Sequence, residues 1–170
     1  VGGLDKKKRD YFLPTCTISG LLSGYTGEGA KTVLPSRAMA KIDMRLVMDQ
    51  DPHEIFDLLR KHLDEQGFDD IELVMIGCEP PGRAPLDSPL AKVVADTWQE
   101  LTGEESVVTP TSQGSGPWYQ LSTAFGIDAC TQGAGHPGTN AHAPNENIYV
   151  EDYITSIKQV VMILDRFAKL

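Results

Sequence analysis

A loop rich in glycine, proline and asparagine near the end of the chain holds the residues best suited to chemistry. Residues 133–148 contain two of the four histidines, His136 and His142. This composition is typical of an irregular surface loop, which presents side chains and does not build a core. His142 lies between two alanines and shortly before Pro144, so its imidazole has small neighbours and a stiffened backbone. The pattern suits a metal ligand or an acid–base group, and a solvated loop histidine is the alternative; His136 is interpreted as a loop histidine.

A turn upstream of this loop is a second candidate. Residues 113–117 read Gln-Gly-Ser-Gly-Pro and precede a helix predicted over residues 117–125. The peptide groups around Gly114 and Ser115 could therefore hold a carboxylate or carbonyl oxygen at the start of that helix. Helix capping alone would explain the same residues, and both interpretations stay open.

Other polar residues have simpler interpretations. Arg45 stands beside Lys41 and Asp43 on a predicted strand, where a salt-bridged surface arginine is the common case. Adjacent acids at positions 104 and 105 follow a glycine and indicate a solvated turn. Of the two remaining histidines, His53 is expected to face solvent and His62 to pack against other residues as a partly buried side chain.

The first part of the chain must supply a small sheet and a helix. Residues 15–22 predict a strand, and residues 38–47 alternate strictly enough to predict a strand with one buried face. A flexible connection containing Gly24, Gly27 and Gly29 joins them. A helix follows, with Asp51 as its N-cap, Pro52 at its first position and Gly67 at its end, and residues 71–76 predict a buried strand. This order corresponds to the latter portion of a ferredoxin-like split βαβ unit.

Residues 79–85, with three prolines, mark the predicted domain boundary. A helix then begins after Ser88 and Pro89 and ends at Gly103. The final helix, from Glu151, has a wide apolar stripe that is expected to face inward. Between these helices the sequence predicts a strand near Val107, the helix over residues 117–125 and a strand over residues 127–131. Such alternation favours an α/β layer in which loops at strand ends form the site.

Composition excludes several classes of function. The 170 residues are 41% hydrophobic and 23% charged, as in an ordinary globular protein, and the net charge of −9 argues against nucleic acid. The basic run at residues 6–9 predicts a solvated linker. No membrane-spanning segment or signal peptide is visible. Three cysteines, an odd number widely spaced in apolar surroundings, predict buried free thiols in a reducing, cytoplasmic compartment: Cys16, Cys78 and Cys130.

Three segments together resemble one enzyme family. The run Ala-His-Ala-Pro-Asn-Glu at residues 141–146 resembles the last metal-ligand loop of the M20 family of di-zinc aminoacylases and dipeptidases. Residues 31–35 and 40–47 are similar to the lid, or dimerisation, domain of that family, closest to its carnosinase-like dipeptidase branch. The turn at residues 113–117 is similar to a substrate-facing turn between the other two. The matches follow the family order and span most of residues 15–168.

The resemblance also implies that the site is incomplete in this sequence. The chain shows no His-x-Asp motif and no Glu-Glu pair able to hold base and ligand, and a catalytic zinc takes about three protein ligands. We therefore expect the C-terminal part of a longer enzyme, and Val1 in place of methionine agrees with that expectation. The fold class expected is α/β. Residues 1–79 would form a partial α+β lid, and residues 80–170 a layered α/β part of a zinc-exopeptidase catalytic domain.

What the resemblance implies for function is metal-assisted hydrolysis of an amide bond in a dipeptide or N-acyl amino acid. His142 would bind one of two zinc ions, with manganese or cobalt as alternative metals, and Asn145 and Glu146 would orient its loop. Arg45 would bind the substrate's free C-terminal carboxylate, since a planar bidentate donor suits that group. Gly114 and Ser115 would contact substrate, and no catalytic base is expected in this chain. A homodimer would form through the lid; the alternative is a non-catalytic dimerisation or binding module.

Overall fold

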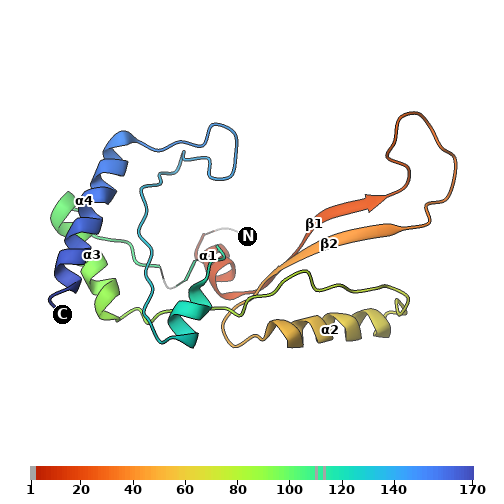
Figure 1. Cartoon of the computed structure of the whole chain (residues 1–170), viewed down its shortest axis with the longest axis horizontal. Coiled ribbons are helices and arrows are strands. Elements are labelled where there is room, and N and C mark those ends of the chain that lie inside the picture. The colour runs from red at the N-terminus through yellow and green to blue at the C-terminus, as the bar shows by residue number, and fades with distance from the viewer. Residues whose placement is uncertain (1–2, 110, 113) are drawn as a thin grey trace. The chain divides into compact units, whose positions relative to one another are not determined.

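The computed structural model describes residues 3–109, 111–112 and 114–170, which belong to two compact units. The first unit runs from Val1 to Pro81 and the second from Gly82 to Leu170 (Figure 1). The division falls inside the proline-rich segment 79–85. The chain combines helices with a small antiparallel sheet, so its fold class is α/β.

The first element is a short helix in the place where the sequence predicted a linker. Helix α1 (Gly3–Phe12) carries the basic run, and none of its residues is buried. Lys6 and Asp10, one helical turn apart, form an ion pair with an Nζ–Oδ2 distance of 2.5 Å. Asp5 in the first turn and Arg9 in the last turn have the signs that the helix dipole favours. The linker prediction is therefore wrong, although the segment is solvated as expected.

Strands β1 (Thr15–Ser23) and β2 (Ala38–Arg45) form a two-stranded antiparallel sheet, as the sequence predicted. The register pairs Thr15 with Arg45 at one end and Ser23 with Ala38 at the other. It contains a bulge between Ile18 and Gly20. Paired residues share a face, so Ile18 and Ile42 lie together on an apolar face.

The face that the sequence predicted to be buried is open to solvent. Ile18 is 63% exposed and Ile42 is 44% exposed. The prediction failed because alternation reports that a face is apolar, whereas burial needs a covering layer. Among the described residues the sheet has two strands, and this face of it remains exposed.

Helix α2 (Pro52–Glu65) begins where its capping signals placed it. The Asp51 carboxylate accepts hydrogen bonds from the backbone N–H groups of His53 (2.7 Å) and Glu54 (3.2 Å). Beyond the helix, Gly67 adopts a left-handed φ of +81°, which favours glycine. His53 is exposed as predicted, but His62 is exposed as well, which contradicts its predicted packing role.

Residues 71–76 do not form the predicted third strand. They pair with no other segment in the described part of the chain, and Ile76 is 86% exposed. The guanidinium group of Arg60 on α2 instead donates hydrogen bonds to the backbone carbonyls of Phe68 and Ile71. These contacts tie the start of the segment to α2, and among the described residues the segment has no strand partner. The first unit therefore contains strand, strand and helix, without the last strand of the expected split βαβ unit.

Two long helices dominate the second unit, and both were predicted. Helix α3 (Pro89–Thr102) is capped by Ser88, whose Oγ accepts a hydrogen bond from the Ala91 N–H at 3.1 Å. It ends at Gly103, which has a left-handed φ of +78°. Helix α4 (Val150–Phe167) packs against α3.

Polar side chains fill the contact between α3 and α4. Thr97 is fully buried and donates its hydroxyl hydrogen bond to the Val93 carbonyl of its own helix (2.8 Å). Gln159 of α4 is 2% exposed, and its Nε2 donates to the Val94 carbonyl of α3 (3.1 Å). Arg166 and Glu100 form an ion pair between the helices.

The apolar stripe predicted to face inward from α4 is not covered by α3. Five residues define this stripe, and each of them is between 41% and 65% exposed: Tyr153, Ile157, Val160, Val161 and Leu164. Helix α4 does carry the predicted apolar stripe, but α3 packs against the side of α4 that carries Gln159. Helix periodicity identifies an apolar side and does not identify the element that meets it.

The segments between α3 and α4 are less regular than predicted. The described residues near Val107 and those at 127–131 form no strand, and Val107 is 89% exposed. A strand requires a neighbour for its backbone groups, and the described part of this unit offers none. The helix predicted over residues 117–125 is present over residues 118–124, and its last five residues form the π-helix η1 (Gln120–Ala124).

Candidate functional site

The loop that leads into α4 is held closed by Asn147. Its backbone N–H donates to the Thr139 carbonyl at 3.0 Å. Its side-chain Nδ2 donates to the carbonyls of Gly138 (3.1 Å) and Asn145 (2.9 Å). One residue therefore ties the beginning of the loop to its end, which allows an irregular segment to keep one conformation.

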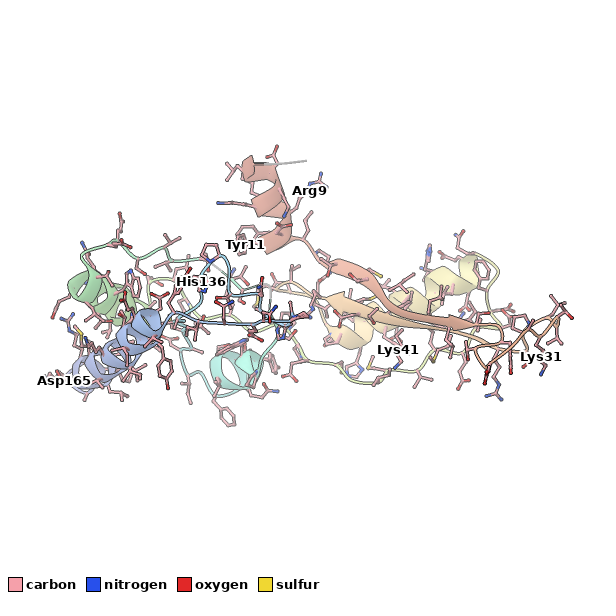
Figure 2. All side chains as sticks on the ribbon, turned by 90° about the horizontal axis from the view of Figure 1, so that it is seen from above. Arg9, Tyr11, Lys31, Lys41, His136 and Asp165 are labelled. Atoms are coloured by element: carbon pink, nitrogen blue, oxygen red, sulfur yellow. The ribbon has the colours of Figure 1, made fainter. Side chains whose placement is uncertain are left out.

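His136 completes this closure with both of its ring nitrogens. The Gly138 backbone N–H donates to Nδ1 at 3.1 Å, and Nε2 lies 3.0 Å from Asn147 Oδ1. Because Nδ1 accepts, Nε2 must carry the proton and donate to Asn147. The ring also stacks on Tyr149, with centroids 4.0 Å apart and planes at 21°. Figure 2 shows His136 on the loop that precedes α4.

His142 lies at the exposed part of the same loop. It adopts a left-handed φ of +61°, and so do Asn140 (+54°) and Asn145 (+61°). Left-handed residues other than glycine cost about 1–3 kcal/mol each and persist where the surroundings determine the backbone. Within the described ranges, no hydrogen bond or ion pair engages the His142 ring. The loop therefore offers an imidazole to solvent from a sharply turned backbone.

The hydrogen bonds that close the loop around His142 come mainly from Asn147, and not from the side chains of Asn145 and Glu146. The side chain of Glu146 is exposed, and Asn145 contributes a backbone carbonyl that accepts from Asn147. Asn147 was not singled out from the sequence, because an asparagine in a loop is ordinary. Its four contacts join residues that lie up to eleven positions apart, and no local pattern reports them.

The donor set around His142 fits one metal ligand and no complete centre. In the chain as described (residues 3–109, 111–112 and 114–170), no three His, Cys, Asp or Glu side chains are placed to hold a metal ion. A neutral imidazole exposed between Ala141 and Ala143 can donate one ring nitrogen to a cation. The other ligands of a complete metal centre would have to come from outside the described residues.

The turn containing Gly114 and Ser115 lies before a helical segment, as the sequence predicted. The Gly114 N–H donates to Ser112 Oγ at 3.1 Å, and Ser115 is exposed. A helical segment over residues 118–124 follows the turn, and its residues 120–124 are π-helical. The substrate contact expected of Gly114 and Ser115 stays a prediction. Gln113 lies outside the described residues.

Close backbone contacts nevertheless fix the segment after this turn. A Cβ on Gly82 would lie 2.4 Å from the backbone nitrogen of Tyr119, so no side chain fits there. A Cβ on Gly116 would lie 2.6 Å from Nε1 of Trp118. The two glycines therefore permit a tight packing of residues 116–119 that any side chain would disturb.

Arg45 lies at the end of β2, on the face opposite Ile42. Its Nε donates to Asp43 Oδ2 at 3.0 Å, and its side chain remains 48% exposed. Arg45 therefore has the salt-bridged surface arrangement that the sequence analysis gave as the common case for such a residue. Arg45 belongs to the first unit, whereas Gly114, Ser115 and His142 belong to two separate segments of the second unit.

The three cysteines are free thiols but are exposed, which contradicts the predicted burial. Cys16 lies on the uncovered sheet face, and Cys130 lies in a segment that forms no strand. Partial screening from water nevertheless raises the pKa of the Cys130 thiol above its ordinary value. Separately, no helix among the described residues is long and apolar enough to cross a membrane.

Comparison with known proteins agrees with this arrangement. Residues 3–70 match the family model of the M20 peptidase dimerisation domain. The Cys-Gly metallodipeptidase DUG1 of Candida albicans is 25% identical over 97% of this chain and 35% of its own length. The crystal structure of the M20 family metallo-carboxypeptidase Sso-CP2 from Sulfolobus solfataricus is similar, with a TM-score of 0.87 and 39% identity. That similarity covers 98% of this chain and 38% of the carboxypeptidase.

A further structural neighbour shares the fold at lower identity. The dipeptidase Dug1p of Saccharomyces cerevisiae superposes with a TM-score of 0.78 and 21% identity, over 98% of this chain and 36% of that protein. The chain thus spans little more than a third of the length of the relatives it matches. The dimerisation-domain match and these relatives together support a fragment of an M20-family metallopeptidase.

Proposed function

We propose that this chain is the C-terminal part of a longer metal-dependent hydrolase that cleaves an amide bond in dipeptides or N-acyl amino acids. The observation that carries the proposal is His142, an exposed imidazole on a left-handed residue of a closed loop. The relatives named as a metallodipeptidase and a metallo-carboxypeptidase support the reaction class. Their greater length supports the view that the other ligands and the catalytic base belong to a part not included here.

Within this proposal the site residues of this chain bind the metal or orient the substrate. His142 holds one of two metal ions, zinc in the first instance and manganese or cobalt as alternatives. The metal, when bound, supplies Lewis-acid polarisation of the scissile carbonyl. Ser115 and the peptide groups of the Gly114 turn orient the substrate near that carbonyl. Arg45 pairs with the C-terminal carboxylate of the substrate, because a planar guanidinium group suits a bidentate contact with that group.

The assay that tests the proposal compares the intact protein with the 170-residue chain. We expect the intact protein to hydrolyse dipeptides, to lose activity on chelation and to regain it with zinc, manganese or cobalt. The chain alone should hydrolyse no dipeptide and should bind zinc weakly, because its described residues provide no set of three ligands. An intact protein without hydrolytic activity, or a chain with robust zinc-dependent cleavage, would overturn the proposal.

A second candidate function is dimerisation without chemistry. The match to a peptidase dimerisation domain covers residues 3–70, and the sheet there exposes apolar residues such as Ile18. Exposed strand edges and apolar faces favour pairing with another copy of the chain. In the enzyme the same surface forms a homodimer, and in the alternative it is the whole function. The assay above separates the two, since a dimerisation module forms dimers and cleaves nothing.

We also place the enzyme in the cytoplasm. All three cysteines are free and exposed, an arrangement that suits a reducing compartment.

Replacing Arg45 with alanine tests the proposed substrate contact. We expect kcat/KM for free dipeptides to fall about 10- to 100-fold, because a charge-assisted hydrogen bond contributes about 1.5–3 kcal/mol. The loss should appear mainly in KM, and C-terminally amidated dipeptides should be affected far less. Lys41→Ala is the matched control, since Lys41 is an exposed cation four residues before Arg45 and therefore on the same face of β2. Equal losses for free and amidated substrates would contradict the assignment.

A further inference from the structure

We propose that His136 is a positioning residue for His142. Its imidazole fixes the conformation of the loop that presents the His142 ring, and this fixing sets the strength of metal binding at that ring. The inference rests on the proposed role of His142 as a metal ligand. It adds a residue whose position in the sequence gave no sign of a role.

The contacts of His136 join the two ends of the loop. On one side its Nδ1 accepts the N–H of Gly138, two residues away. On the other side its Nε2 donates to Asn147 Oδ1, eleven residues away, and its ring stacks on Tyr149 at 4.0 Å. The Nδ1 contact is local and selects the tautomer, whereas the Nε2 contact and the stack span the loop. Together they hold His136 in one orientation.

The segment enclosed by these contacts is strained, and this is why closure matters. Asn140, His142 and Asn145 all have left-handed φ values, and one backbone bond within the segment joins the Ala143 N–H to the Asn140 carbonyl. A loop with so few internal bonds keeps such a backbone only when its ends are held. Opening the ends would let residues 140–145 relax and turn the His142 ring away. Groups that orient a ligand in this way commonly change metal affinity 10- to 100-fold.

Two substitutions separate the local contact from the spanning one. His136→Asn places an amide oxygen near the position of Nδ1 and removes the donor to Asn147. His136→Gln places an amide nitrogen near the position of Nε2 and can still donate to Asn147. His136→Phe keeps a ring that can stack on Tyr149 and removes both hydrogen bonds. If the spanning hydrogen bond is the important one, glutamine should preserve the loop better than asparagine or phenylalanine.

The experiment uses the intact protein and two measurements. Amide hydrogen exchange of residues 137–148 in the metal-free protein reports loop closure, and competition with a chromophoric chelator reports zinc affinity. We expect His136→Phe and His136→Asn to exchange faster in the loop and to bind zinc 10- to 100-fold more weakly. His136→Gln should lie close to the unmodified protein in both measurements. If His136→Phe fails to fold, the comparison of glutamine with asparagine decides, and equal behaviour or the reverse order overturns the inference.

His142→Ala distinguishes failure of this inference from failure of the proposed function. If that variant loses zinc while His136→Phe keeps native exchange and native affinity, the positioning role is wrong and the proposed function stands. If His142→Ala keeps all of its zinc, the proposed function is wrong and the positioning role falls with it.

Discussion

Replacing His142 with alanine in the intact protein should abolish dipeptide hydrolysis and remove about one equivalent of tightly bound zinc. The described residues contain no group of three His, Cys, Asp or Glu side chains that could hold the metal without His142. Loss of a metal that contributes several kcal/mol to the transition state should lower kcat/KM about a thousandfold or more. Zinc content by elemental analysis, together with initial rates at saturating metal, measures both effects.

The dimer should survive this substitution, because the match to the dimerisation domain ends at residue 70 and His142 belongs to the second unit. His62→Ala is a matched control. It also removes an exposed imidazole, but from α2 in the first unit. An alanine variant of His142 with undiminished zinc content would refute the assignment, whatever its activity. Loss of zinc in the His62 variant would show that the measurement lacks specificity.

Helices α2, α3 and α4 could be predicted from the sequence because their signals are local. Asp51 and Pro52 fix the start of α2, and Ser88 and Gly103 bracket α3. Each of these residues acts on backbone groups within a few positions of itself, so its effect survives in any context. The pairing of β1 with β2 was also predictable, because the two strands lie close in the sequence.

The failed strand predictions share a physical cause. Three segments have the apolar character of strands: residues 71–76, the residues near Val107, and residues 127–131. A strand exists only when another segment pairs with its backbone N–H and C=O groups. Arg60 engages the carbonyl of Ile71, and the described part of the second unit contains no strand to pair with the others. Apolar periodicity identifies the face of a segment that is suited to burial, but it does not identify the segment that pairs with it or covers it.

In the candidate site, too, some residues could be recognised from local sequence and others only from the folded structure. His142 stands out because small residues and proline surround it, and that composition is local. The importance of His136 depends on Asn147 and Tyr149, which lie eleven and thirteen residues further along. Only folding brings these rings and amides together. Likewise, the helix after Gly114 could be predicted, but the π-helical form of its residues 120–124 could not.

A substitution at Gln159 should have the largest effect on stability, and the effect should depend on pH. Gln159 is 2% exposed, and its Nε2 donates to the Val94 carbonyl. Its Oε1 is buried and has no hydrogen-bond partner among the described residues. Gln159→Glu puts a carboxylate in that place, and the nearby Arg166 of α4 already pairs with Glu100 of α3. We expect the free energy of unfolding to fall by about 3–5 kcal/mol at pH 7.

The direction of the pH dependence follows from which form of the new side chain fits. A protonated carboxyl matches the glutamine amide in shape, and its O–H can donate to the Val94 carbonyl. Burial therefore raises the folded-state pKa of the new glutamate above its unfolded value of about 4.3. Below that unfolded value the variant should approach the stability of the original protein. As pH rises toward the folded-state pKa, stability should fall by about 1.4 kcal/mol per pH unit.

Urea unfolding at pH 4 and pH 7, followed by tryptophan fluorescence, measures the difference. Both tryptophans, Trp98 and Trp118, belong to the second unit, so their signal reports on the helix pair. Gln159→Met is the matched control: it removes the same hydrogen bond, buries an uncharged side chain of similar length, and should cost about 1 kcal/mol at both pH values. Equal, pH-independent losses in the two variants would mean that Gln159 contributes shape alone. A loss confined to the glutamate variant and to high pH would locate the cost in burying a charge between α3 and α4.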